Sequence, residues 1–307
     1  MNALRAHLED YLAIRRALGF KLERAGALLA QFVTFAEEAG TDFCTVELAL
    51  AWARLPVGAS PIWVARRLGV VRCFARHLEV LDPANEVIPG DLFAVRAARR
   101  TPYLYSPEEI AALLEAARRL QNPLKAATFE TLVGLLACTG LRAGEAMRLN
   151  RADFDADHGL LTVRNSKFNK SRQILLHSTT VDALRRYGRR RDELCPSRPT
   201  SALFLSSTGA RLGHPVLQPT FVGLLRDSGV GRSAPRRPTV HDLRHSFTVA
   251  TLVRWYRDGD DVAVRMPALS TYLGHVDPSS TYWYLSASAE LLRRAADRLE
   301  AAFGDRR

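Results

Sequence analysis

The segment LLTVRNSKFNKSRQILLH, residues 160–177, decides the fold class. Two short runs rich in Leu, Ile and Val, at 160–164 and 172–177, flank a polar loop at 165–170. Two apolar runs around a polar loop are typical of a β-hairpin. Because helical patterns surround this hairpin on both sides, the sequence predicts a mainly α-helical protein with a small antiparallel β-sheet. The loop holds two of the four lysines of the chain, Lys167 and Lys170.

The first 80 residues have helical periodicity. Apolar residues recur at helical spacing over 4–18, 22–39 and 46–55. Ser60-Pro61 predicts the start of a fourth helix, because serine is a good N-cap and proline suits the first helical turn. We therefore expect a helical N-terminal domain over residues 1–95.

One face of the fourth predicted helix is basic. Its apolar side chains fall on one side and three arginines fall on the other. A row of arginines is typical of an ordinary solvated face, and in a DNA-binding protein the same row can lie along phosphates. If DNA is the partner, the candidate contacts are these arginines and two in the linker that follows: Arg66, Arg72, Arg76, Arg99 and Arg100.

A short basic linker separates two predicted domains. Proline and glycine interrupt the helical pattern between residues 82 and 101, and arginines cluster at the end of that stretch. Ser106-Pro107-Glu108-Glu109 is a capping box with proline at the first helical position, which predicts the first helix of the second domain. The predicted division is a helical domain at 1–95, a linker at 96–104, and a mixed α/β domain with a C-terminal helix at 105–307.

The overall charge points to a polyanionic partner. The formal net charge is +11, and the excess lies in the linker and the C-terminal two-thirds. Such an excess is typical of nucleic-acid-binding proteins, although a basic protein without that partner has the same composition. No apolar run reaches 18 residues, the N-terminus lacks the layout of a signal peptide, and the four cysteines form no CxxC pair. We therefore expect a cytoplasmic protein with reduced cysteines and no membrane span.

Three segments outside the hairpin carry side chains suited to phosphate chemistry. They are TGLRAGE at 139–145, HDLRHSF at 241–247, and LGH at 273–275 with Tyr284 nine residues after its histidine. Arg142 and Glu145 are three residues apart at a helix start, so their side chains can meet. The alternative to a functional role is an ordinary surface ion pair.

His241 and Arg244 are one helical turn apart, which predicts that they point the same way. Zinc binding by His241, His245 and His275 is an alternative, but no HExxH pattern is present, and we expect no metal. Core packing is an alternative for Tyr284, because other aromatic residues surround it in the sequence: Tyr272, Tyr282 and Trp283.

Together these segments resemble the tyrosine recombinase (phage integrase) family over about residues 103–290. The family pattern is an arginine in TGLRxxE, a lysine in a β-hairpin, HxxRH, LGH, and a tyrosine nine residues further on. Here KFNKSR is similar to the KGNKER of the family, and the order and spacing fit. The helical N-terminal region resembles the core-binding domain of the family. The resemblance implies this catalytic set: Arg142, Lys167, His241, Arg244, His275 and Tyr284, with Glu145 in a supporting role.

The implied reaction is attack of the Tyr284 phenol on a DNA phosphodiester, giving a 3′-phosphotyrosyl link and a free 5′-hydroxyl. Two arginines can clamp the non-bridging oxygens, and His275 can donate a further hydrogen bond. By resemblance His241 assists the loss of the phenolic proton. The departing oxygen needs a proton, which an ammonium can supply and a guanidinium cannot, so Lys167 is our candidate and Lys170 the alternative, or a phosphate contact. No cofactor is implied.

Two features depart from the family pattern. His275 follows His241 by 34 positions, which is longer than usual. The extra length falls between Arg254 and Met266 and predicts a longer connection between helices. Tyr282 also lies near the place of the nucleophile and is the alternative to Tyr284.

The resemblance also implies partners. Double-stranded DNA is the substrate, and recombination needs four protomers, or this chain with a sister recombinase. The amphipathic segment 290–303 is a candidate to pack on a neighbouring protomer or on its own domain. LGHVDPSSTYWYLSAS looks like recombinases of transposon-like mobile elements, and we expect the simpler two-domain type. The alternatives are a type IB topoisomerase and a DNA-binding homologue that does not cut.

Overall fold

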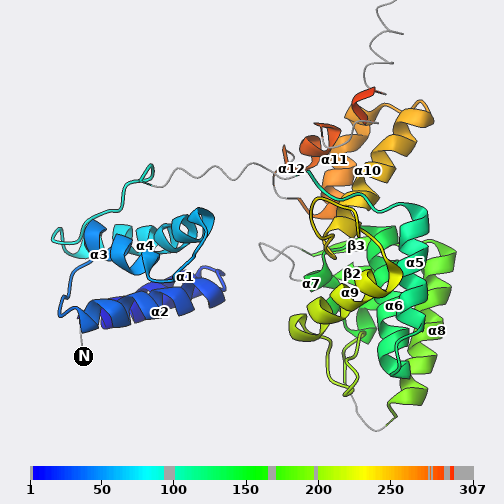
Figure 1. The fold of residues 1–307 in the computed structure, drawn as a ribbon, viewed down its shortest axis with the longest axis horizontal. Coiled ribbons are helices and arrows are strands. Elements are labelled where there is room, and N and C mark those ends of the chain that lie inside the picture. Colours follow the sequence, from blue (N-terminus) through cyan, green and yellow to red (C-terminus); the bar gives the residue numbers. More distant parts are fainter. Residues whose placement is uncertain are drawn as a thin grey trace, which may run out of the picture. The chain divides into compact units, whose positions relative to one another are not determined.

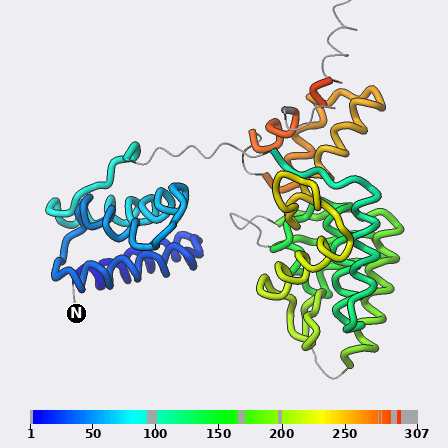
Figure 2. Tube along the Cα trace, viewed as in Figure 1, coloured from blue at the N-terminus to red at the C-terminus, as the bar shows by residue number. Residues whose placement is uncertain are grey.

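The computed structural model describes residues 3–92, 101–164, 171–196, 200–275, 277, 279–286 and 291–293 (Figures 1 and 2). The chain divides into two compact units, Met1–Arg100 and Thr101–Arg307. This division falls inside the stretch predicted as a linker. No helix among the described residues is long and apolar enough to span a membrane.

The described part of the first unit contains four helices. They are α1 (Ala3–Ala17), α2 (Glu23–Glu38), α3 (Val46–Arg54) and α4 (Pro61–Leu81). The predicted start of α4 is confirmed, because the Ser60 side chain accepts a hydrogen bond from the Trp63 backbone nitrogen at 3.3 Å. Large apolar side chains from all four helices fill the core, among them Leu4, Phe32, Trp52 and Phe74.

Helices dominate the second unit. The long ones are α5 (Pro107–Arg118), α6 (Pro123–Thr139), α8 (Ser178–Leu194), α9 (His214–Ser228), α10 (Asp242–Arg257) and α11 (Val262–Leu273), with the shorter α7 (Ala143–Arg148) and α12 (Ser279–Tyr282). The capping box before α5 is confirmed, because Ser106 and Glu109 cap each other's backbone. Helix α6 packs between α5 and α8 (Figure 1), and most of its residues are buried.

A three-stranded antiparallel sheet confirms the predicted fold class. Its order is β1 (Phe154–Asp155), β2 (Leu160–Val163) and β3 (Arg172–Leu175), and Val163 pairs with Arg172 where the hairpin opens into its loop. Leu161, Val163 and Ile174 are buried in the main core of the unit. The short strand β1 was not anticipated, because two residues carry no alternation pattern.

The longer connection that we expected between Arg254 and Met266 is wrong. Helix α10 runs to Arg257 and α11 begins at Val262, so only residues 258–261 connect them. The two helices pack together around Leu252, Met266 and Tyr284. Gly274 ends α11 with a φ of 68°, a left-handed conformation that glycine adopts without strain.

Candidate active site

The segments singled out in the sequence meet at one end of the second unit. Gly140 ends α6 in the left-handed region, and a Cβ there would lie 2.5 Å from the Phe247 ring on α10. The glycine therefore lets the TGLR turn approach α10 closely. This approach brings Arg142, at the start of α7, towards Arg244.

Arg244 is almost completely buried, with 2% of its surface exposed. Its Nη1 donates to the Gly140 carbonyl at 2.7 Å, and its Nη2 donates to the Leu273 carbonyl at 2.7 Å and to His275 Nε2 at 2.8 Å. Burial, and then the nearby positive charge of Arg142, lower the Arg244 pKa to about 10. Arg244 therefore stays positively charged at neutral pH while it joins three segments.

Arg142 is the more accessible arginine, with 27% of its side chain exposed. The predicted contact with Glu145 is present, because Arg142 Nη1 donates to Glu145 Oε1 at 2.9 Å. Nη2 of Arg142 donates to the Gly274 carbonyl at 3.1 Å. The two arginines thus bind backbone carbonyls of the same turn, Leu273-Gly274, and lie side by side at the site.

Arg172, which the sequence interpretation missed, completes the basic cluster. It begins β3, and its two terminal nitrogens donate to the two carboxylate oxygens of Glu145 at 3.1 and 2.9 Å. Burial raises the pKa of Glu145, but Arg172 and then Arg142 outweigh this effect and lower it to about 2. The signal was available in the sequence, since Arg172 lies two residues after the loop that holds both lysines.

His275 lies between Arg244 and a threonine. An arginine cannot accept a hydrogen bond, so His275 Nε2 is the acceptor from Arg244. Nδ1 of His275 therefore carries the proton and donates to Thr281 Oγ1 at 2.7 Å. Burial, and then the positive charge of Arg244, lower the His275 pKa to about 4, so this histidine is neutral at physiological pH.

Tyr284 is buried beside these groups, with 3% of its surface exposed. A hydrogen bond of 2.8 Å joins its hydroxyl to His245 Nδ1, and its ring stacks parallel to the His275 ring. Burial raises the Tyr284 pKa, and burial followed by the nearby His241 lowers the His245 pKa to about 4. The alternative tyrosine, Tyr282, is 47% exposed.

His241 precedes the first residue of α10 and is exposed at the surface of the site. Partial burial of its ring, and then the positive charges of Arg244 and Arg142, lower its pKa, so its imidazole lies near both arginines. Its ring meets the His245 ring edge-on at 4.8 Å. The described residues contain no group of three or more His, Cys, Asp or Glu side chains that could hold a metal ion.

Asp242 anchors the start of α10. Its carboxylate accepts hydrogen bonds from Arg236, from the Thr239 backbone nitrogen and hydroxyl, and from the Tyr103 backbone nitrogen. The sequence interpretation gave Asp242 no role. Its contacts fix the end of the helix that carries Arg244 and His245.

Four of the remaining predicted residues, Lys167, Lys170, Arg99 and Arg100, lie outside the described residues. In the first unit Arg66 and Arg76 are exposed on α4. Arg72 is engaged locally, because it donates to the backbone carbonyls of Ile88 and Pro89 at 2.8 and 2.7 Å.

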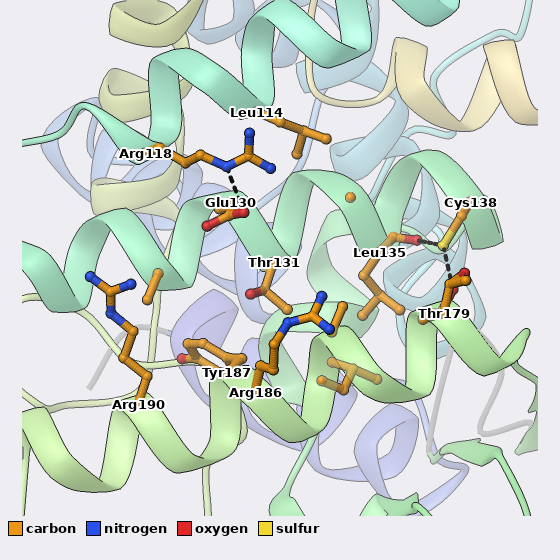
Figure 3. A pocket seen from close by; sticks show the side chains of 15 residues that line it. Leu114, Arg118, Glu130, Thr131, Leu135, Cys138, Thr179, Arg186, Tyr187 and Arg190 are labelled. Carbon is orange, nitrogen blue, oxygen red and sulfur yellow. Dashed lines mark hydrogen bonds and ion pairs between the residues drawn. The ribbon is translucent and has the colours of Figure 1, made fainter.

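A cavity of about 720 Å³ lies elsewhere in the second unit, between α5, α6 and α8 (Figure 3). Arg118 on α5 and Glu130 on α6 form an ion pair across it at 2.8 Å, and the Arg186 and Arg190 side chains line it from α8. None of the described members of the arginine, histidine and tyrosine cluster lines this cavity. The cavity is therefore separate from the candidate active site.

Comparisons with known proteins agree with this geometry. The sequence model of the phage integrase family matches residues 104–290. The chain is 43% identical to y4rB of Sinorhizobium fredii, named as an integrase/recombinase, over 100% of both chains. It is 30% identical to tyrosine recombinase XerC of Alcanivorax borkumensis, over 78% of this chain and 74% of that protein.

A solved structure shares the fold. The Tn1549 transposon integrase, in complex with transposon right end DNA, superposes with a TM-score of 0.65 at 17% identity, covering 97% of this chain and 99% of that chain. The protein is a site-specific DNA recombinase, and the chain belongs to the phage integrase family.

Proposed function

We propose that this recombinase integrates or transposes a mobile DNA element, and that Tyr284 cleaves the DNA through a 3′-phosphotyrosyl intermediate. The observation that carries the proposal is the convergence of Arg142, Arg244, His275 and Tyr284, from separate parts of the chain, on one site. Each of these side chain types suits one part of phosphoryl transfer to a phenol.

The two arginines are the clamp for the scissile phosphate. In the reaction, charge develops on the non-bridging oxygens, and guanidinium groups stabilise it best when they are already oriented. Arg142 offers the accessible guanidinium, and the bonds from Arg244 to two carbonyls hold the buried one in place. His275 accepts from Arg244 in this state, so donation to a phosphate requires a proton on its Nε2.

The nucleophile is held by a neighbouring histidine. His245 Nδ1 is within hydrogen-bond distance of the Tyr284 hydroxyl, whereas the exposed His241 contacts the His245 ring. We propose that the phenolic proton passes first to His245 when the phosphate arrives, because a nearby anion raises the pKa of a histidine. His241, our sequence-based candidate, then acts next to His245 and not directly on the phenol.

The leaving 5′-oxygen requires a separate acid. Lys167 remains our candidate, since an ammonium can give up a proton under conditions where a guanidinium cannot. In the sequence it lies between β2 and β3, and β3 starts with Arg172 at the site. Lys170 is the alternative.

We propose double-stranded DNA as the substrate and a tetramer of protomers, or a mixed tetramer with a sister recombinase, as the active assembly. The first unit serves as the core-binding domain and the second as the catalytic domain. The names of y4rB and of the Tn1549 transposon integrase support a role with mobile elements, and we place the enzyme in the cytoplasm with its DNA. The relatives that match across most of this chain are named as recombinases and integrases, which favours recombination over a type IB topoisomerase.

A nicked duplex that carries the ends of the encoding element tests this proposal. The nick traps the intermediate, because the short 5′ fragment diffuses away after cleavage. We expect a protein–DNA adduct on the 3′ phosphate and a new 5′-hydroxyl that a kinase can label. Attachment to a 5′ phosphate, or relaxation of plasmids that lack the element ends, would contradict the proposal.

A further inference from the structure

We infer that Arg172 is a positioning residue for the phosphate clamp: it fixes the Glu145 carboxylate and through it sets the direction of the Arg142 guanidinium. The inference rests on the proposed function, since it takes Arg142 to contact the scissile phosphate. Arg172 itself is only 12% exposed in its side chain, and it begins the strand that leaves the lysine loop.

The Glu145 carboxylate accepts four hydrogen bonds. Its Oε1 accepts from Arg142 Nη1 at 2.9 Å and from Arg172 Nη1 at 3.1 Å, and its Oε2 accepts from the Arg142 backbone nitrogen at 3.1 Å and from Arg172 Nη2 at 2.9 Å. The two parallel bonds from Arg172 fix the plane of the carboxylate. Since the Arg142 guanidinium meets only one of its oxygens, that plane determines where the guanidinium points.

Arg172 also keeps this carboxylate charged. The Glu145 side chain is buried, and burial alone favours the neutral acid. The Arg172 guanidinium makes the strongest favourable interaction with the charged form, ahead of Arg142. Without Arg172, we expect the Glu145 pKa to rise, and a protonated Glu145 holds Arg142 less firmly.

A third contact ties Arg172 to the turn before His275. Its Nε donates to the Tyr272 carbonyl at 2.7 Å, and a Cβ on Gly274 would lie only 2.8 Å from Arg172 Nη1. The same turn supplies the carbonyls that hold Arg142 and Arg244. All three guanidinium nitrogens of Arg172 therefore have partners inside the protein, and two of them bind the Glu145 carboxylate, as a residue that positions this carboxylate requires.

The test compares Arg172→Met with Arg172→Lys on the nicked duplex, with DNA binding and adduct formation measured separately between about pH 5 and pH 8. We expect Arg172→Met to bind DNA as the wild type does but to cleave about tenfold to a hundredfold more slowly. Its rate should fall further as the pH decreases, because Glu145 becomes protonated. The wild type should not show this Glu145-dependent fall, since its Glu145 pKa is about 2.

Arg164→Met is the matched control. Arg164 follows β2 on the same hairpin and pairs with Asp153 at 2.7 Å, away from Glu145, so it should not add the acid-dependent loss. Arg172→Lys keeps one charged contact and should recover part of the cleavage rate. If the methionine variant does not fold, the lysine variant is compared with the wild type in its place.

Two results would overturn the inference: cleavage by the Arg172 variants at the wild-type rate at every pH, or a loss that is the same at every pH and is not relieved by lysine. An absent adduct in the wild type would instead contradict the proposed function.

Discussion

Arg67 in the first unit and Arg244 in the second are both buried, and the two arginines differ in their surroundings. Arg67 on α4 of the first unit stacks on the Trp52 ring at 3.7 Å and donates to the Trp52 carbonyl at 2.8 Å. Arg244 on α10 of the second unit contacts two carbonyls from distant segments and a histidine. Arg67 thus interacts with one neighbouring residue, whereas Arg244 joins the TGLR turn, the LGH turn and α10.

Burial of a cation is therefore not by itself a mark of function. Around Arg67 a tryptophan ring and a carbonyl offset part of the lost hydration, while the buried Nε has no hydrogen-bond partner. Around Arg244 a second arginine lies nearby even though like charges repel, and a buried tyrosine and two neutral histidines complete the cluster. Positive charges that protein acids only partly neutralise are suited to an anion that arrives from outside, such as a phosphate.

The largest expected effect follows from replacing Arg244 with lysine. Lysine keeps the positive charge but cannot make the set of planar contacts to Gly140, Leu273 and His275. We expect adduct formation to fall by about a hundredfold to a thousandfold while DNA binding persists. In Arg67→Lys, adduct formation should stay at the wild-type rate; equal losses in both variants would remove the distinction between the two arginines.

Replacing His245 tests how the nucleophile is held. In His245→Leu the Tyr284 hydroxyl loses its hydrogen bond with the imidazole, and we expect cleavage to slow by about a hundredfold. His245→Asn keeps an acceptor but cannot take up the proton, so it should remain slow. An asparagine variant with wild-type cleavage would show that His245 only positions the phenol.

Arg67 should matter for stability and not for catalysis. Arg67→Ala removes the stacking on Trp52 and the contact with its carbonyl, and we expect the free energy of unfolding of the first unit to fall by about 2 kcal/mol. Denaturant unfolding measures this loss. A large decrease in cleavage by the folded variant would contradict the account.

The two histidines with depressed pKa values should make the stability of the second unit depend on pH. His245 and His275 have pKa values of about 4 in the folded protein, below their ordinary value of about 6.5. The unfolded chain binds more protons between these values, so stability should decrease as the pH falls from about 6.5 towards 4. Thermal unfolding of the wild type and of His245→Asn measures it, and the variant should lose part of the dependence.

The smallest effects should separate the arginines of α4. Arg76 is exposed. If it contacts a phosphate, Arg76→Gln should reduce the slope of the logarithm of the DNA-binding constant against the logarithm of the salt concentration by about one. Arg72→Gln should leave that dependence unchanged, because the Arg72 side chain binds the Ile88 and Pro89 carbonyls. The reverse result would move the DNA contact to Arg72.

The sequence predicted the fold class and the segments that form the site better than it predicted the contacts between individual side chains of those segments. Ser60 and Ser106 mark helix starts by local rules, so those starts could be predicted. The pairing of Arg142 with Glu145 followed from their spacing. Spacing alone could not show that β3 would place Arg172 on the same carboxylate, because that contact joins residues 27 positions apart.

His245 was missed for a similar reason. The HxxRH pattern drew attention to its first histidine, His241, whereas the second histidine, His245, makes the hydrogen bond with the Tyr284 hydroxyl. The length of the α10–α11 connection was wrong because no proline or glycine rule fixes how far two helices extend towards each other. Gly259 marks the turn, yet only tertiary packing decides where the helices end.

The most direct test of the central claim is adduct formation on the nicked duplex by the wild type, Tyr284→Phe and Tyr282→Phe. Tyr284 is buried against His245 and His275, whereas Tyr282 is exposed, so we assign the nucleophile to Tyr284. The account predicts a covalent adduct with the wild type and with Tyr282→Phe, and none with Tyr284→Phe, although that variant still binds the DNA. An adduct that persists in Tyr284→Phe would contradict it and would move the nucleophile to another tyrosine.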